Sequence, residues 1–215
     1  KSTLLNILAG LLPYRVGIAS VDGVKIEGPG SDRGVVFQEH AILPWRTVAR
    51  NIGHGLELRG MAKEEREARV KDFVNLVGLS GFEEKYPHEL SGGMKQRCAV
   101  ARTLCADPVV MLMDEPFAAV DAQTRITLQE ELNSIAIATK KTILFITHAV
   151  DEATFLGDRC FVFSARPGRL KKIININIPR EKRIWADMNA DDEFINSRDE
   201  ILRLVREEVS VAVEE

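Results

Sequence analysis

Several side chains whose types suit phosphate and metal chemistry stand directly after apolar runs of this sequence. Asp114 and Glu115 end one such run, His148 ends another, and Gln38 ends a shorter run that is rich in valine. If these runs are parallel β-strands, their carboxyl ends meet at one edge of a sheet, where ligands collect. An acid pair alone could simply cap the next helix, and a lone histidine is more often structural. Three strand ends that together supply carboxylates, an imidazole and an amide favour a functional site.

A second candidate is the octapeptide at 90–97, in which Ser91, Gly92 and Gly93 precede a helical pattern. The Ser91 hydroxyl can cap the helix, and the glycines let an anion approach the backbone closely. Free amides and the positive end of the helix dipole make such a terminus an anion site. An ordinary capped helix with a glycine turn is the alternative for Ser-Gly-Gly alone, but the whole octapeptide is far more specific.

The sequence opens with Lys1, Ser2 and Thr3, followed by the mostly apolar stretch 4–10. This resembles the end of a phosphate-binding loop that runs into its helix. In the full motif, the lysine reaches the β- and γ-phosphates and the next hydroxyl binds magnesium. We therefore expect that the chain begins inside such a loop and that N-terminal strands are missing.

Short β-branched runs alternate with longer helical patterns, which predicts an α/β fold with a parallel sheet. We expect strands at 35–37, 109–113, 142–147, 160–163 and 173–178, and helices at 3–12, 63–77, 93–105, 123–138, 149–156 and 199–209. The mostly helical part at about 45–105 predicts a helical subdomain inserted into a single domain, 1–215. A C-terminal extension is expected at about 179–215.

Composition limits the possible functions. With 45% hydrophobic and 28% charged residues, the chain suits one α/β domain with a sizeable core. The net charge of -3, without an obvious basic stripe, argues against a nucleic-acid partner. Cys98, Cys105 and Cys160 lack metal-type or redox-type spacing, so we expect Cys98 and Cys105 to be buried. No stretch is long enough to span a bilayer, so membrane association would need a partner.

The order of these motifs (lysine-serine, glutamine, the octapeptide as signature loop, acid pair, histidine) resembles that of the ABC ATPases over essentially the whole chain. Ala119-Val120-Asp121 is similar to the family's D-loop, although most relatives carry leucine in place of Val120. The finer similarity, to importers of nitrate, taurine and aliphatic sulfonates, lies in 34–40, 43–45, 55–60, 113–119, 147–153 and 164–168. The resemblance implies a P-loop NTPase core with a parallel sheet and an inserted helical subdomain.

The resemblance also implies that two copies sandwich two ATP molecules with Mg²⁺. Glu115, His148 and Gln38 would form the catalytic set, with Glu115 as the base that polarises water and His148 in contact with the γ-phosphate. The residues implied in nucleotide binding are Lys1, Ser2, Thr3, Gln38, Asp114, Asp121 and His148, with Ser91, Gly92 and Gly93 contributed by the other copy. Of these, Ser2, Gln38 and Asp114 would hold the metal.

By the same resemblance, the chain would be the ATP-hydrolysing subunit of an importer, peripheral on the cytoplasmic face of the cell membrane. Its partners would be a second, identical ATPase subunit, permease subunits and, indirectly, a periplasmic or lipoprotein solute-binding protein. These 215 residues alone would hydrolyse ATP negligibly, because the phosphate loop is incomplete. The alternatives are a soluble ABC ATPase not coupled to transport and a non-catalytic module with the same fold.

Overall fold

The computed structural model covers the chain and describes residues 1–37, 41–118, 120–165 and 167–214. The α-helices are α1 Ser2–Leu8, α2 Val48–Ile52, α3 His54–Leu58, α4 Lys63–Leu76, α5 Gly92–Cys105, α6 Ala122–Thr139, α7 Val150–Leu156, α8 Trp185–Met188 and α9 Asp192–Glu214. The strands are β1 Ser20–Val21, β2 Val24–Lys25, β3 Arg33–Val36, β4 Val110–Asp114, β5 Thr142–Ile146, β6 Arg159–Phe163 and β7 Leu170–Asn175. Two short 3-10 helices lie at Pro87–Glu89 and Arg180–Lys182.

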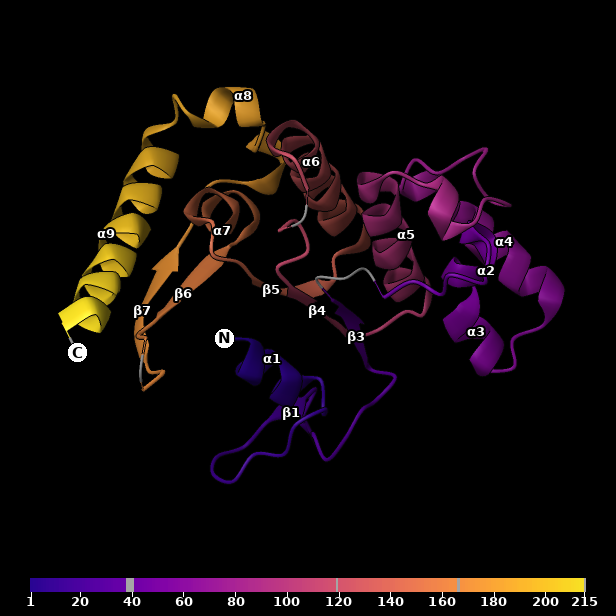
Figure 1. Cartoon of the computed structure of the whole chain (residues 1–215), viewed down its shortest axis with the longest axis horizontal. Coiled ribbons are helices and arrows are strands. Elements are labelled where there is room, and N and C mark those ends of the chain that lie inside the picture. Colours follow the sequence, from indigo (N-terminus) through magenta and orange to yellow (C-terminus); the bar gives the residue numbers. More distant parts are fainter. Residues whose placement is uncertain (38–40, 119, 166, 215) are drawn as a thin grey trace.

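A parallel sheet in the order β3-β4-β5 occupies the middle of the molecule (Figure 1). Val36 lies opposite Met113, and Asp114 lies opposite Ile146. The three strands point the same way, so their carboxyl ends share one edge of the sheet. The prediction of a parallel α/β sheet is confirmed.

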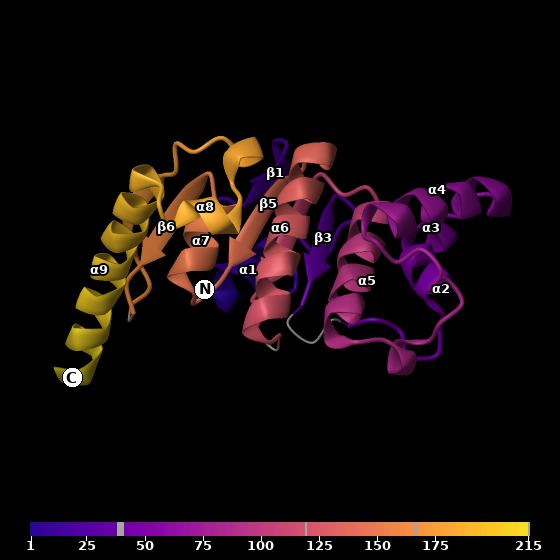
Figure 2. The same cartoon turned by 90° about the horizontal axis from the view of Figure 1, so that it is seen from above.

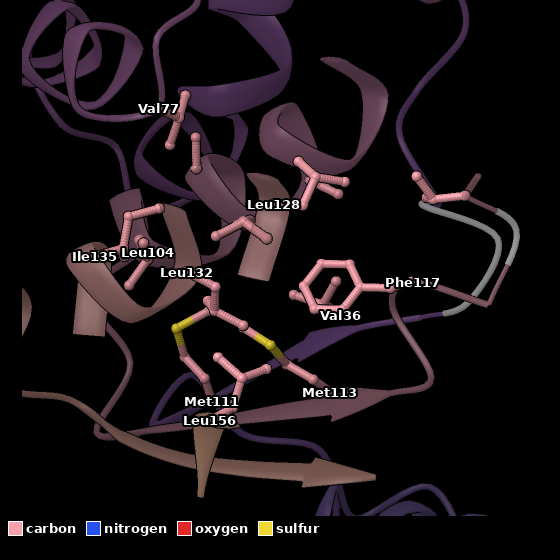
Figure 3. Close-up of a cluster of buried hydrophobic side chains, with 14 of the residues drawn as sticks. Val36, Val77, Leu104, Met111, Met113, Phe117, Leu128, Leu132, Ile135 and Leu156 are labelled. Atoms are coloured by element: carbon pink, nitrogen blue, oxygen red, sulfur yellow. The ribbon is translucent and has the colours of Figure 1, made fainter. Parts of the chain in front are cut away.

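Side chains of β4 alternate between two apolar clusters. Met111 and Met113 are fully buried in the larger cluster, which α5 and α6 cover (Figure 3). Leu112 belongs to the smaller cluster, together with Leu5 of α1 and Ile146 of β5. A parallel strand that is covered on both faces must be apolar at nearly every position, which explains the unbroken apolar run before the acid pair.

The segment between β3 and β4 is mostly helical. Helices α2, α3 and α4 pack near or against α5 and lie at the opposite end of the molecule from α9 (Figures 1 and 2). Asn51 of α2 is fully buried and holds the chain that enters this part. Its amide donates to the carbonyl oxygens of Leu43 and Arg46 at 3.1 and 2.9 Å and accepts from the Leu43 N–H at 2.7 Å. The segment after β3 is therefore fixed to α2 by a buried side chain whose polar atoms are satisfied.

One buried arginine anchors the C-terminal part, in which α9 packs on α7, β6 and β7. The side chain of Arg183 is 1% exposed. It donates to the carbonyl oxygens of Phe155, Gly157 and, twice, Ile178 at 2.8 to 3.0 Å, and to the Asp158 carboxylate at 3.0 Å. All five N–H donors of the guanidinium are therefore used. The arginine joins the end of α7 to the chain that leads into α8.

The hairpin of β1 and β2 is absent from the sequence-based expectations, although its turn carries a strong signal. Asp22 and Gly23 both have positive φ, 47° and 79°, as two-residue hairpin turns require. The expected helix at 3–12 ends at Leu8. Gly10 has φ 76° and lies so close to Gly28 that a Cβ would meet the Gly28 carbonyl oxygen at 2.0 Å. Here a glycine turn overrides an apolar pattern that continues past it.

Other expectations concern the C-terminal helix, the cysteines and the membrane. Helix α9 begins at Asp192 rather than near 199, and Asp191 accepts a hydrogen bond from the Phe194 N–H at 2.9 Å at its start.

Cys98 and Cys105 are buried, as expected, and burial raises the pKa of Cys98 to about 12. Within the described ranges, no helix is both long and apolar enough to cross a bilayer.

Replacing Arg183 tests how much the stability of the C-terminal part depends on this side chain. Arg183→Leu leaves buried carbonyl oxygens without donors, so we expect the free energy of unfolding to fall by about 3 kcal/mol. Arg203→Leu is the control, because Arg203 is 61% exposed and its ion pair is with Glu207 of the same helix. That change should cost less than about 1 kcal/mol. Urea unfolding measures both, and equal losses would contradict an anchoring role for Arg183.

Candidate functional site

The edge of the central sheet brings together residues from β4 and β5. Asp114 is the last residue of β4, and Glu115 follows it. The Glu115 N–H donates to the Ile146 carbonyl oxygen at 2.9 Å, which continues the pairing with β5 by one residue. His148 lies just beyond the end of β5. The parallel register therefore places an acid pair and an imidazole side by side.

A chain of polar contacts joins Lys1, His148 and Glu115. Lys1 Nζ lies 3.3 Å from His148 Nδ1, and His148 Nε2 lies 2.6 Å from Glu115 Oε1. An ammonium group can only donate, so Nδ1 is the acceptor and the ring proton of the neutral imidazole sits on Nε2. That proton points at Glu115. The contacts thus fix one tautomer of His148 and orient the carboxylate.

Ser2 and Asp114 provide a pair of oxygen atoms beside this chain of contacts. Ser2 Oγ donates to Asp114 Oδ1 at 3.2 Å. Hydroxyl and carboxylate oxygens suit Mg²⁺, which binds few protein ligands and keeps water or phosphate oxygens in its remaining positions. In the part of the chain that the structure describes, no group of three or more His, Cys, Asp or Glu residues could hold a metal ion. The Ser2 and Asp114 oxygen atoms alone fit a magnesium ion whose other positions are filled by water or phosphate oxygens.

The cluster is open on one side. The His148 side chain is 71% exposed, whereas that of Glu115 is 24% exposed. Lys1, Ser2 and Thr3 are exposed as well, and Thr3 makes no side-chain hydrogen bond within the described ranges. His148 therefore faces solvent above a partly covered carboxylate. Exclusion of water from this site would need further cover over the His148 ring.

Glu115 has a left-handed backbone conformation, with φ 46°. A residue with a Cβ pays about 1 kcal/mol in this region. The neighbouring backbone groups hold it there: its N–H pairs with β5, and its carbonyl oxygen accepts from the Ala118 N–H at 3.1 Å. The tight turn that results directs the carboxylate toward His148.

Other candidate residues lie at the start of α5. The Ser91 hydroxyl caps this helix by accepting from the Met94 N–H at 3.3 Å. Gly92 is exposed, and a Cβ there would meet nothing within 4 Å. Gly93 is buried, and a Cβ there would lie 3.1 Å from the Thr124 methyl group of α6. Gly92 thus leaves backbone open to an approaching anion, while Gly93 lets two helices pack closely.

Asp121 is the N-cap of α6, the helix whose Thr124 lies against Gly93. Its carboxylate accepts from the Thr124 N–H at 3.0 Å, and this hydrogen bond lowers the pKa of Asp121. No hydrogen bond or ion pair between described residues joins Asp121 or Ser91 to the cluster around His148. Within one copy, the candidate residues therefore form two separate groups. Gln38 lies outside the described residues, so its metal and water roles stay a prediction.

Sequence reasoning missed Thr147, which shapes the turn that carries His148. Its hydroxyl accepts from the Ala149 N–H at 2.9 Å, so the hydrogen bond closes around the histidine. A threonine hydroxyl that bonds the backbone two residues onward is a known local turn. The type of Thr147 and its place after a strand were the only signals available.

The sequence comparisons with known proteins all point to the same protein family. The ABC transporter family matches residues 1–118. The uncharacterized ABC transporter ATP-binding protein MJ0412 of Methanocaldococcus jannaschii is 51% identical over 209 residues, which are 97% of this chain and 76% of that protein. The nitrate import ATP-binding protein NrtD of Synechocystis is 45% identical over 96% of this chain and 79% of that protein. The taurine import ATP-binding protein TauB of Rhizobium johnstonii is 45% identical over 94% of this chain and 78% of that protein.

A solved structure is similar as well. It is the dimer of the ATP-binding cassette MJ0796 in a post-hydrolysis state, bound to ADP and Pi. The TM-score is 0.68 at 27% sequence identity, and the match covers 83% of this chain and 81% of that chain. A fold of this kind accounts both for the parallel sheet and for the residues at its edge whose side chains suit phosphate and metal binding.

Backbone strain at Glu115 can be tested separately from chemistry. Glu115→Gly and Glu115→Ala both remove the carboxylate, but only alanine keeps a Cβ at φ 46°. We expect the glycine variant to be more stable than the alanine variant by about 1 kcal/mol. The same pair at Ser134, on the exposed face of α6, should show the opposite order by about the same amount. Thermal unfolding of the four variants measures these differences in stability. If the alanine variant is the more stable one at both positions, backbone strain at Glu115 is ruled out.

Proposed function

Because this chain belongs to the ABC transporter family and has the α/β fold of its ATPases, we propose that it is the ATP-hydrolysing subunit of an importer. The transported solute would be small, such as nitrate, a sulfonate or taurine, in line with the names of its relatives. The observation that carries the proposal is the cluster of Lys1, Ser2, Asp114, Glu115 and His148 at one sheet edge. A cation, oxygen ligands and an acid–imidazole pair are what phosphoryl transfer requires.

Each residue of the cluster has a task that follows from its contacts. The Lys1 ammonium, which donates to His148, can equally donate to β- and γ-phosphate oxygens. Ser2 and Asp114 would hold Mg²⁺, which when bound neutralises charge on the phosphates. Glu115, held by its turn, orients and polarises the attacking water. His148 donates from Nε2 to Glu115 and, after a small rotation of its exposed ring, to a γ-phosphate oxygen.

A second copy of this chain would complete the site. The exposure of His148 supports this, because hydrolysis by positioned groups needs a site from which bulk water is excluded. Ser91 and Gly92 lie at an exposed helix start that can present amides and a hydroxyl to a γ-phosphate. They belong to the group that does not contact His148 within one copy. Two copies in opposite orientation would bring each group against the other.

The remaining proposals concern the subunit's surroundings. The single domain 1–215 would comprise a helical subdomain at about 45–105 and a separate C-terminal extension at about 179–215. The helical subdomain would contact permease subunits, and a solute-binding protein would deliver the solute to those subunits. The ATPase would then lie on the cytoplasmic face of the membrane as a peripheral subunit.

The assignment of Glu115 as base predicts a specific loss. In the full-length protein, Glu115→Gln should bind ATP and Mg²⁺ yet hydrolyse ATP at least about a hundred-fold more slowly, because the amide cannot accept the proton. The variant should accumulate as an ATP-bound dimer. Glu193→Gln, on the surface of α9, is the control and should hydrolyse at the wild-type rate. Turnover by Glu115→Gln close to that of the wild type would refute this role.

The shared site predicts complementation between inactive subunits. Ser91→Arg and Lys1→Ala should each be inactive, but a heterodimer of the two has one composite site without a lesion. With random exchange and independent sites, roughly a quarter of the wild-type rate should return. Mixing Ser91→Arg with Gly92→Asp is the control, because every composite site then carries a lesion. Steady-state ATPase assays after subunit exchange measure the outcome, and no recovery in the first mixture would contradict sites that are shared and independent.

A further inference from the structure

The turn that carries His148 is held from within the protein by a threonine and a glutamate. Thr147 Oγ1 accepts from the Ala149 N–H at 2.9 Å and donates to Glu152 Oε2 at 2.6 Å. The two bonds enclose the backbone of His148. Because one hydroxyl makes both bonds, a movement of Glu152 would act on the same group that closes the turn.

Glu152 needs a positive partner, and Arg125 is placed to be one. Glu152 lies in the first turn of α7, and its side chain is only 8% exposed. A buried carboxylate is costly unless it is paired. Its second oxygen, Oε1, lies 3.8 Å from Nε of Arg125 on the neighbouring helix α6. Removing the guanidinium would therefore change the surroundings of the same carboxylate that holds Thr147.

The other end of Arg125 holds the turn that carries Asp121. Its guanidinium donates to the Val120 carbonyl oxygen at 2.8 Å, and its own backbone N–H donates to the Asp121 carbonyl oxygen at 2.9 Å. Val120 is buried and directly precedes Asp121, the exposed N-cap of α6. One arginine side chain therefore touches both the turn that leads to Asp121 and the acid that orients the turn of His148.

We propose that Arg125, Glu152 and Thr147 form a positioning relay between the Asp121 turn and the His148 turn. The proposal rests on the function proposed above, in which a second copy of this chain packs against the exposed ends of α5 and α6. Contact with that copy shifts the Asp121 turn, Arg125 moves with it, and Glu152 and Thr147 carry the shift to His148. No proton is transferred along the relay. Its effect is to adjust the position of the imidazole, which already contacts Glu115 in a single copy, when the second copy is in place.

Activity measurements can separate the relay from a purely structural role. Arg125→Gln and Glu152→Gln in the full-length protein should each lower kcat on the order of ten-fold, because a shift of the His148 turn misplaces its ring. KM for ATP should change by less than about two-fold, since no hydrogen bond or ion pair between described residues joins either side chain to the cluster that binds nucleotide. The double variant should be no slower than the slower single variant, because both changes break one path. Lys141→Gln, which breaks an exposed 2.8 Å pair with Asp107, should keep wild-type kinetics.

Thr147 supplies a conservative comparison within the same path. Thr147→Ser keeps the hydroxyl and should retain most of kcat, whereas Thr147→Val keeps the shape and should lose as much as Glu152→Gln. Thr147→Ser, Thr147→Val and Glu152→Gln should unfold within a few degrees of the wild type, whereas Arg125→Gln should unfold at a lower temperature because it leaves the buried Glu152 carboxylate without its partner. All kinetics are therefore compared at a temperature at which every variant is fully folded. Unchanged kcat in Arg125→Gln and Glu152→Gln would overturn the relay, as would losses that multiply in the double variant.

The ring signals of His148 test the relay without relying on hydrolysis. In NMR spectra of the free protein, assigned with His148→Gln, these signals should shift in Arg125→Gln, Glu152→Gln and Thr147→Val but not in Lys141→Gln. Signals that stay in place in all variants would overturn the relay even if kcat falls. If the wild type does not hydrolyse ATP but the signals shift as expected, the proposed function fails while the contact path stands.

Discussion

Parallel pairing of β4 with β5 is the constraint on which the site depends. The pairing sets Asp114 opposite Ile146, and the Glu115 N–H extends it by one hydrogen bond. A shift of one residue would turn every side chain of β4 to the other face and carry the acid pair away from His148. Such a shift is costly because Met111 and Met113 are buried on one side and Leu112 on the other. Apolar packing on two faces thus fixes the position of polar groups at the edge.

The candidate residues are divided between two kinds of support. In the group around His148, the acid pair and the histidine stand on strand ends, where backbone pairing leaves little freedom, and Glu115 is even held in a strained conformation. Ser91 and Asp121 stand at helix starts, each capping its own helix with a side-chain oxygen. Gly93 brings these two helix starts into contact, so they would move together. One group is thus rigidly attached to the sheet, and the other is attached to the helices that cover it.

Much of the fold and of the acid–histidine edge could be predicted, because apolar runs that end abruptly in polar residues mark buried parallel strands. The hairpin turn at Asp22 and Gly23 carries an equally clear sequence signal, the Asp-Gly pair, but the hairpin is not among the predicted elements. The contact between Lys1 and His148 could not be predicted from composition or periodicity, since it joins side chains 147 positions apart through the packing of α1 on the sheet. Arg125 and Glu152 were missed for a similar reason, because each looks like an ordinary charge on a helix until α6 and α7 are packed together.

Substitutions at the two neighbouring glycines at the start of α5 would be suppressed by second-site mutations in different places. A side chain at Gly93 crowds the Thr124 methyl group of the same subunit, so a smaller residue at 124 would suppress the defect from within the fold. A Cβ at Gly92 meets no atom within 4 Å among the described residues of its own subunit. Its suppressors would have to arise on whatever surface comes to face that residue in the assembly. The location of second-site revertants would therefore identify the residues of the facing surface.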